Sequence, residues 1–282
     1  MSSQAIAAPG QRQGALTGFS WFARDVIVLT GRSLIHVRRD PAQLADVTIQ
    51  PVMFVLLFTY VFGSAIHLPG GGNYHQYLVG GIFGMTMAGT APGVAVGLAT
   101  DIKSGIVDRF RALPMSRAAV LVGRLAADLL TALLGLLVTV AVGLVVGWRA
   151  NTGPADILLG FGLALLFAYA MSWAGAAAGL WLRNPESAQA LGLVVFFPLA
   201  FVSNAFVATQ SLPSWLSAVA DWNPISTVTA SCRSLFGNPN PSALVNVWPL
   251  QHPELATALW SAALLAVFVP LSIHLYRRES PS

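Results

Sequence analysis

The sequence predicts an all-α integral membrane protein with six transmembrane helices. Two observations carry this prediction, the composition and the spacing of the charged residues. Of the 282 residues, 55% are hydrophobic and 9% are charged, whereas a soluble domain has about 45 to 50% apolar and about 25% charged residues. A charge at the bilayer centre costs about 2.5 to 3.5 kcal/mol, so long charge-free segments mark transmembrane helices. The composition therefore excludes a soluble globular protein.

Charge-free gaps place the six helices along the chain. The 54 residues between Asp46 and Asp101 accommodate two helices of about 20 residues each, separated by the segment HLPGGGNYHQ. Four other gaps hold one helix each, whereas the gap between Arg233 and Glu254 contains four prolines and is excluded. The helices are expected near 47–66, 77–99, 119–147, 157–181, 188–207 and 255–276.

Basic residues predict the orientation. With the N-terminus inside, thirteen Lys and Arg residues fall in inside segments and two, Arg149 and Arg233, fall outside. The positive-inside rule therefore places both termini in the cytoplasm. No apolar core of signal-peptide length occurs in residues 1–46. The expected divisions are a disordered tail (1–17), an interfacial helix (18–46), the six-span domain (47–276) and a cytoplasmic tail (277–282).

The segment 18–46 is expected to form a helix lying on the cytoplasmic membrane surface. Arg24, Arg32 and Arg39 recur at steps of eight and seven residues on one helical face, while aromatic and aliphatic residues cover much of the rest. Arg38 lies beside Arg39, and Pro41 turns the chain into the first span. A simple membrane anchor explains the same pattern.

A second amphipathic segment, 101–117, joins the second and third spans on the cytoplasmic side. Ile102, Ile106, Phe110 and Leu113 form an apolar stripe that ends before Pro114. Such a helix can fit a groove on a cytosolic partner, or it can rest on lipid, and the residues favour both equally.

The third segment, 208–254, is too long for an ordinary loop and is expected to form short helices that dip into the outer leaflet or cover the outer side of the bundle. Trp215, Val219 and Trp222 mark an apolar helix edge, and Asn223-Pro224 marks a turn. Each tryptophan alone is also typical of an interfacial belt.

Small residues recur every fourth position within two spans, at Gly89, Gly93 and Gly97 and at Gly160, Ala164, Ala168, Ser172 and Ala176. These faces allow close helix contacts within one chain or between two chains. Arg124 and Asp128, four residues apart, are expected to neutralise each other near the headgroups.

Several kinds of chemistry are missing from the sequence. It contains no GxxxxGK[ST] phosphate loop, no paired carboxylates within a span and no Cys and His cluster at metal-ligand spacing. We therefore predict no catalytic residue, no metal and no cofactor bound by this chain. The net charge of +4 comes from too few charged residues for a nucleic-acid partner.

Three stretches of the sequence resemble the membrane subunits of type-2 ABC exporters of the daunorubicin-resistance type. They are VRRDPAQLADVTIQPVMFVLLFTYVFGSAI (37–66), DIKSGIVDRFRALPMSRAAVLVGRLAAD (101–128) and residues 184–238, which begin NPESAQALGLVVFF. Where the family often has Glu at the end of the second span, this chain has Asp101.

The resemblance implies an N-terminal interfacial helix, a cytoplasmic coupling helix between spans two and three, and re-entrant outer helices before span six. The coupling residues would be Asp101, Gly105, Ile106, Arg109, Phe110, Arg111 and Pro114, next to Arg24, Arg32, Arg38, Arg39 and Pro41 of the interfacial helix. The pathway or outer gate would include Phe201, Ser203, Asn204, Phe206, Trp215, Trp222, Asn223 and Pro224.

By the same resemblance, the chain would be the permease of an ATP-driven exporter of hydrophobic drug-like or lipid compounds. It would form a homodimer and pair with two copies of a separate ATPase subunit, which would use ATP and magnesium. Two other classes stay open. One is a non-transporting membrane scaffold, and the other is a membrane enzyme that would use His67, His75 or Asp156.

Overall fold

The computed structural model describes residues 41–63, 68, 71–105 and 117–278. Within these residues every regular element is helical and no strand occurs. Four helices are long and apolar enough to cross a membrane, namely Tyr74–Lys103, Val120–Val146, Pro154–Leu182 and Pro253–Tyr276. Two shorter apolar helices cover Thr48–Val61 and Pro185–Phe201. The all-α class is therefore confirmed, and an apolar helix lies at each of the six expected places.

Six apolar helices, some of them made of two or three consecutive elements, follow one another along the described residues, and short helices lie between the fifth and the last. The first helix is α2 (Pro41–Leu57) with the π-helical η1 (Phe58–Phe62), and the second is α3 (Tyr74–Ala88) with α4 (Thr90–Lys103). Then come α6 (Arg117–Val146) and α7 (Pro154–Leu182). The fifth comprises α8 (Pro185–Leu191), η2 (Gly192–Phe196) and α9 (Phe197–Phe201), and the last is α13 (Pro253–Arg278).

Short helices fill the segment before α13, as the sequence predicted. They are η3 (Thr209–Ser211), α10 (Ser214–Asp221), α11 (Pro224–Leu235), η4 (Pro241–Leu244) and α12 (Trp248–Gln251). Asn223 accepts a hydrogen bond from the main-chain N–H of Ile225 at 2.8 Å, so the Asn-Pro turn starts α11.

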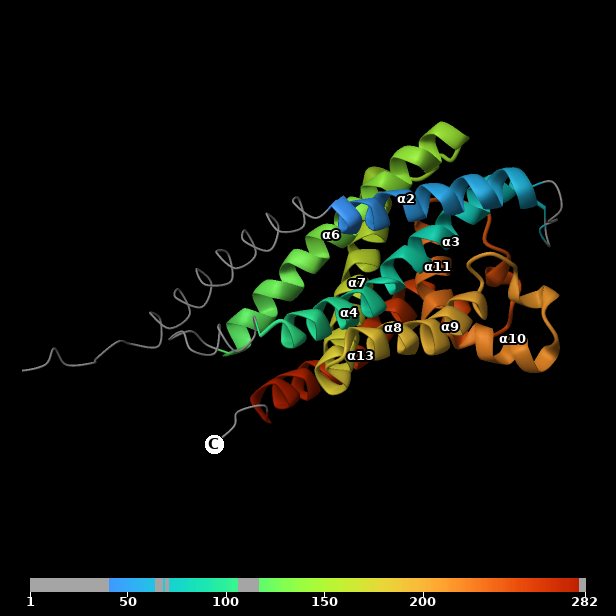
Figure 1. Ribbon diagram of the computed structural model, residues 1–282. Helices are drawn as coiled ribbons and strands as arrows, with labels where there is room; N and C mark the ends of the chain where they lie inside the picture. The colour runs from blue at the N-terminus through green and yellow to red at the C-terminus, as the bar shows by residue number, and fades with distance from the viewer. Residues whose placement is uncertain (1–40, 64–67, 69–70, 106–116, 279–282) are drawn as a thin grey trace, which may run out of the picture.

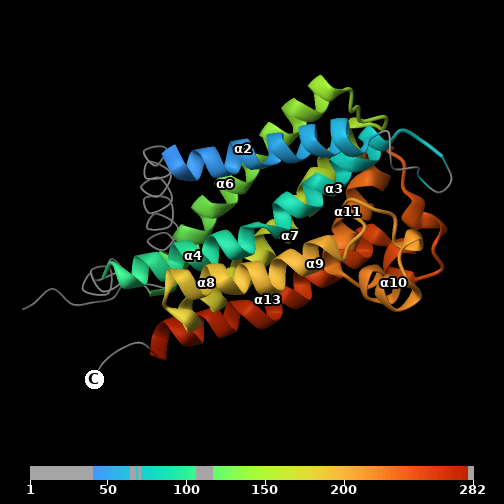
Figure 2. The same cartoon turned by 45° about the vertical axis from the view of Figure 1, so that its right-hand side comes forward.

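Helix α7 lies at the centre of the bundle, where it packs against α4, α13, α11 and α6. Helix α2 packs against α6 and α3, while α8 packs against α4. The long helices run along a common direction (Figure 1). The C-terminal ends of α4 and α13 lie at one end of the bundle and α10 lies at the other, as the turned view also shows (Figure 2). We refer to these as the inner end and the outer end, after the orientation that the basic residues predict.

Small residues let α4 and α7 approach to main-chain contact. A Cβ added to Gly175 would overlap the carbonyl oxygen of Ala91, and one added to Gly179 would lie 2.6 Å from the carbonyl oxygen of Ala95. The predicted small-residue face of α7 is buried within this chain, with Ala164, Ala168, Ser172 and Ala176 all fully buried. This face therefore serves packing within the chain, and it is not left open for a second copy.

In the first and second helices, one boundary each departs from the charge-gap expectation. Helix α2 begins at Pro41 and not near 47, because a charge ends an apolar gap without ending a helix. Helix α4 includes Asp101 and ends at Lys103, and Gly105 follows with a φ of 70°. That left-handed conformation favours glycine and stops the helix.

Adding one methyl group to the contact between α4 and α7 should destabilise the fold. We expect Gly175→Ala to lower the free energy of unfolding by about 1 to 3 kcal/mol, because the new Cβ forces the two backbones apart. The matched control is Gly93→Ala on α4, where a Cβ meets no atom within 4 Å. Thermal unfolding of both variants in detergent checks this, and equal melting temperatures would contradict it.

Candidate functional site

Five aromatic rings form a continuous run at the outer part of the bundle. Ring centroids are 6.0 Å apart for Phe54 and Phe58, 4.2 Å for Phe58 and Phe206, 5.3 Å for Phe206 and Phe201, and 4.5 Å for Phe201 and Phe197. This aromatic run thus joins the first apolar helix to the fifth. Phe206 is buried, whereas Phe201 and Phe197 are 43% and 48% exposed. The run offers flat apolar surface that is partly open.

The fifth helix ends earlier than predicted. It was expected to continue to 207, but α9 ends at Phe201 and Val202 leaves the helical region with φ −84° and ψ 58°. We call residues 202–207 the outer break. The expected boundary was wrong because the carbonyl groups of this segment are bound by side chains of other elements, a competition that charge spacing does not reveal.

Asn223 holds the start of the outer break. Its side-chain Nδ2 donates to the carbonyl oxygens of Leu199 at 2.7 Å and Val202 at 2.6 Å, while its Oδ1 caps α11. One buried amide therefore ends the fifth helix and begins α11. This gives a predicted gate residue a structural task.

Arg233 binds the centre of the outer break. Its side chain is fully buried on α11. Nε donates to the carbonyl oxygen of Tyr77 at 2.9 Å, and Nη1 and Nη2 donate to those of Asn204 and Ala205, each at 3.0 Å. Its Cζ lies 3.4 Å from the centroid of the Tyr77 ring. The sequence count placed Arg233 in an outside segment, and the structure adds that its side chain is fully buried.

Two tyrosines of α3 also donate hydrogen bonds to the outer break. The Tyr77 hydroxyl donates to the carbonyl oxygen of Asn204 at 2.6 Å, and the Tyr74 hydroxyl donates to that of Phe206 at 3.2 Å. The amide N–H of Asn204 donates to Ser226 Oγ at 3.0 Å. Three successive carbonyl groups of the outer break are therefore hydrogen-bonded to α3 or α11.

Three glycines of α3 leave space for this assembly. A Cβ at Gly80, Gly81 or Gly84 would meet, respectively, the side chain of Arg233, the carbonyl of Ala205 or the side chain of Thr229. The GGxxG pattern formed by Gly80, Gly81 and Gly84 is the sequence signal for this close contact between α3 and the elements around Arg233.

The predicted gate residues thus differ in burial and in position. Ser203 and Asn223 are buried and donate to main-chain carbonyl groups, whereas the buried Asn204 side chain donates to Ser242 Oγ at 2.8 Å. Trp215 on α10 and Trp222, which directly follows α10, are 70% and 57% exposed. Pro224 begins α11. Of the gate residues, only Phe201 and Phe206 belong to the aromatic run.

A charged cluster lies at the inner end of α4 and α6. Arg124 forms an ion pair with Asp101 through Nη1, and its Nε donates to Asp128 Oδ2 at 3.3 Å. The expected pair of Arg124 and Asp128 is confirmed, and the structure adds Asp101. The side chains of this charged cluster are partly buried, with Arg124 24% exposed, Asp101 26% and Asp128 12%. The cluster ties the last turn of α4, which begins the predicted coupling segment, to α6.

The remaining predicted inner residues lie outside the part of the chain that the structure describes. They are Arg24, Arg32, Arg38, Arg39, Ile106, Arg109, Phe110, Arg111 and Pro114. Gly105 is described and ends α4, and Pro41 is the first residue of α2. Lys103 and Glu186 form an exposed ion pair at 3.7 Å that joins the end of α4 to α8 and contributes little stability.

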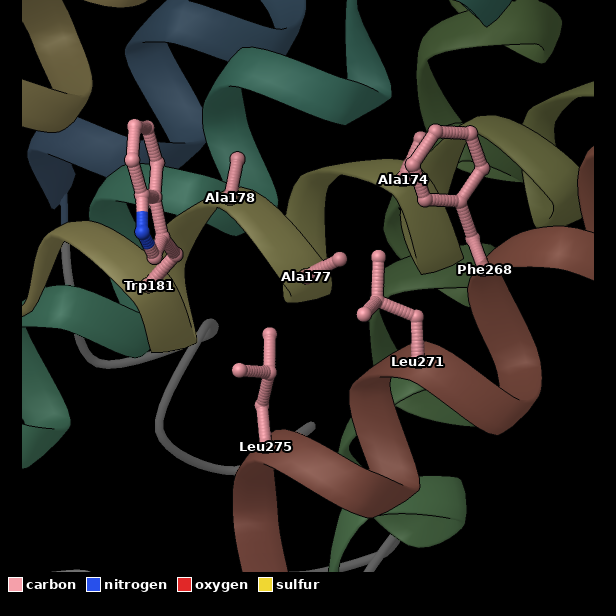
Figure 3. A pocket seen from close by; sticks show the side chains of 7 residues that line it. All are labelled: Ala174, Ala177, Ala178, Trp181, Phe268, Leu271 and Leu275. Carbon is pink, nitrogen blue, oxygen red and sulfur yellow. The ribbon is translucent and has the colours of Figure 1, made fainter. Parts of the chain in front are cut away.

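The described residues contain no group of three or more His, Cys, Asp or Glu side chains that could hold a metal ion. A shallow groove of about 340 Å³ lies between α7 and α13, lined only by Ala174, Ala177, Ala178, Trp181, Phe268, Leu271 and Leu275 (Figure 3). Because its walls carry almost no polar atoms, it offers no group that could orient a reacting ligand.

Comparisons with known proteins agree with this arrangement. Residues 24–236 match the family described as ABC-2 type transporter. The chain is 32% identical to a daunorubicin resistance ABC transporter permease protein of Streptomyces coeruleorubidus over 249 residues, covering 88% of this chain and 84% of the relative. It is 24% identical to a probable doxorubicin resistance ABC transporter permease protein of Mycobacterium tuberculosis (strain H37Rv), covering 97% and 95%. A putative transport permease of Porphyra purpurea is 25% identical, covering 76% and 75%.

The inner charged cluster yields a stability prediction. Arg124→Gln leaves two carboxylates facing each other, so we expect it to lower the free energy of unfolding by about 1 to 3 kcal/mol, less than for a fully buried pair because these groups are partly exposed. The triple variant Asp101→Asn, Arg124→Gln, Asp128→Asn should recover most of this loss, since no net charge is left unpaired. Thermal unfolding in detergent measures both. A triple variant as unstable as the single one would contradict the assignment.

Proposed function

The chain belongs to the ABC-2 type transporter family and is a membrane permease subunit of an ABC exporter, and we propose that it moves hydrophobic drug-like or lipid compounds outward. It is a multi-pass protein of the bacterial plasma membrane, and its family implies an ABC ATPase as partner. The chain itself binds no cofactor in this proposal, and ATP and magnesium act in the partner subunit.

The aromatic run is the observation that carries the cargo class. Planar apolar compounds stack on aromatic rings, and Phe197 and Phe201 keep nearly half of their surface open. No Asp, Glu, Lys or Arg lies on α2 after Asp46, on η1, on η2 or on α9. Two of the relatives are named for resistance to daunorubicin and doxorubicin, which are planar aromatic drugs of this class.

Six spans are proposed from the four long and two short apolar helices. The fifth helix, Pro185–Phe201, has 17 residues. At 1.5 Å per residue it reaches about 25 Å, less than the roughly 30 Å of a bilayer core. The outer break and α10 would complete the crossing, which fits the prediction that the helices before α13 re-enter the outer leaflet.

The coupling helix between spans two and three stays part of the proposal. Asp101 begins that segment and is bound to Arg124, so movement of the segment would be passed to α6 as well as to α4. A rigid link of this kind suits a subunit that receives its driving force from the cytoplasmic side.

A homodimer with two ATPase subunits is proposed for the assembled exporter. The small residues of α7 are used within the chain, so they do not supply this interface. Large apolar side chains on the first and fifth helices are instead exposed, among them Met53, Tyr60 and Val194 at 56%, 73% and 73%. A second copy facing these helices would enclose both aromatic runs between them.

Transport tests the cargo proposal directly. We expect proteoliposomes containing the chain and its co-purified ATPase to accumulate daunorubicin only with ATP and magnesium. Phe201→Ala should reduce that transport about tenfold. Stacking of a flat ring system on an aromatic side chain contributes about 1 to 3 kcal/mol, as measured for nucleic-acid bases. The control Trp181→Ala removes an exposed ring from the groove between α7 and α13, away from the aromatic run, and should leave transport unchanged. Equal transport by both variants would contradict the proposed path.

The coupling proposal has its own test. Phe110→Asp places a charge on the apolar stripe of the 101–117 segment and should abolish co-purification of the ATPase while the protein still reaches the membrane. Leu134→Asn on α6, whose side chain is exposed toward lipid, is the control and should retain the ATPase. Undiminished co-purification and export with Phe110→Asp would overturn the assignment and favour a scaffold that docks partners elsewhere.

A further inference from the structure

Arg233 is a buried cation that has no carboxylate partner among the described residues. Its charge is balanced only by dipoles, namely three main-chain carbonyl groups, and by the face of the Tyr77 ring. Burying an unpaired charge is costly unless every donor is satisfied. An arginine at this position therefore requires a task that an apolar residue could not perform.

The positions of the three carbonyl groups indicate that task. Two belong to consecutive residues of the outer break, Asn204 and Ala205, and the third belongs to Tyr77 within α3. Non-helical backbone within an apolar bundle is tolerated only where protein groups satisfy it. Arg233 supplies these groups and simultaneously ties the outer break to α3.

The tie fixes the centre of the aromatic run. Phe206 directly follows Ala205, its carbonyl is held by Tyr74, and its ring stacks on Phe58 with centroids 4.2 Å apart. Its neighbour Phe201, in contrast, lies on α9, where four of the five residues are not buried. Residues 204–206 are therefore tied to α3 and α11 at three carbonyl groups, whereas α9 is tied to the start of α11 by the bond from Asn223 to the Leu199 carbonyl.

We propose that Arg233 is a positioning residue of the outer gate, which holds residues 204–206 closed on α3 as a fixed support while α9 moves against it. This inference rests on the proposed function. The residue does not touch cargo, and it acts through Phe206. Opening then takes place at Val202, between the fixed segment and α9, and it requires the bonds from Asn223 to Leu199 and Val202 to break.

Arginine is the side chain that this geometry needs. Its planar guanidinium presents several N–H donors in fixed directions and stacks on an aromatic ring, whereas lysine is a single compact charge. Gly80 and Gly81 allow the approach, because a Cβ at either position would meet Arg233 or the Ala205 carbonyl. Arg233→Lys should therefore keep the charge but only some of the three hydrogen bonds to the carbonyl groups.

The test measures how accessible the outer break is. Val207→Cys places a thiol beside the held segment, where the native side chain is half-buried and packs against the core. The native Cys232 is buried, and burial raises the pKa of its thiol to about 12, so it gives little background labelling. A membrane-impermeant maleimide is applied to the full chain in membranes without ATP. Transport and ATP hydrolysis are then measured in the complex with the ATPase.

Arg149→Gln is the matched control. Arg149 is an exposed arginine at the same end of the bundle, and it donates to the carbonyl oxygens of Leu144 and Trp148. Removing it changes the net charge as Arg233→Gln does. We expect Arg233→Gln to speed labelling at position 207 by about fivefold or more over this control, because unpaired buried carbonyls favour opening. Arg233→Lys should fall between the two.

The functional result should separate transport from ATP hydrolysis. With Arg233→Gln, transport per ATP hydrolysed should fall about tenfold while ATP hydrolysis stays within about twofold, because an unsupported gate leaks. Tyr77→Phe removes only the hydroxyl bond to Asn204 and keeps the ring, so it should fold and show a smaller change in the same direction.

Each contrary result counts against the proposal. Labelling equal to the Arg149→Gln control, or transport and hydrolysis falling together in proportion to protein level, would make Arg233 a purely structural residue. If Arg233→Gln does not fold, unchanged labelling with Tyr77→Phe overturns the proposal. If the wild-type complex moves no cargo while the labelling differences hold, the proposed function fails and the support of the outer break stands.

Discussion

The outer end depends on one constraint, namely that polar backbone within an apolar bundle must be hydrogen-bonded by the protein itself. The fifth helix stops at Phe201, and the carbonyl groups that follow would be unsatisfied without Arg233, Tyr74, Tyr77 and Asn223. The position of α11 follows from this requirement, because Arg233 must reach both the outer break and α3. The glycines of α3 follow in turn, because they make room for the arginine and the carbonyl it binds.

Helices α3 and α4 connect the two polar centres of the molecule. At the outer end α3 provides the Tyr77 carbonyl for Arg233, and at the inner end α4 provides Asp101 for Arg124. Between these points the contact with α7 consists of small residues at main-chain distance. Close-packed interiors of this kind shift between discrete arrangements and resist gradual deformation. One nearly continuous helix, Tyr74–Lys103, is therefore suited to pass a movement from the inner end to the outer end.

The use of the small residues also bears on assembly. A stripe of Gly and Ala on a membrane helix suits contacts within a chain and between chains equally, and here α7 turns it toward α4, α11 and α13. The surface left for a second copy carries larger side chains on the first and fifth helices. An interface built there would rest on the same aromatic run that we connect with cargo, so assembly and transport would share one surface.

The sequence by itself determined the helical class, the approximate position of each apolar helix and the pairing of Arg124 with Asp128. Hydropathy and helical spacing fix these features, because lipid penalises charges and residues four apart share a helix face. The tertiary structure alone decided where the fifth helix ends, that Asp101 joins the inner cluster and that Arg233 is buried. Each of these depends on a bond between groups that are far apart in the sequence, such as the Tyr77 carbonyl and the Arg233 side chain. No local pattern records which distant groups a buried side chain will meet.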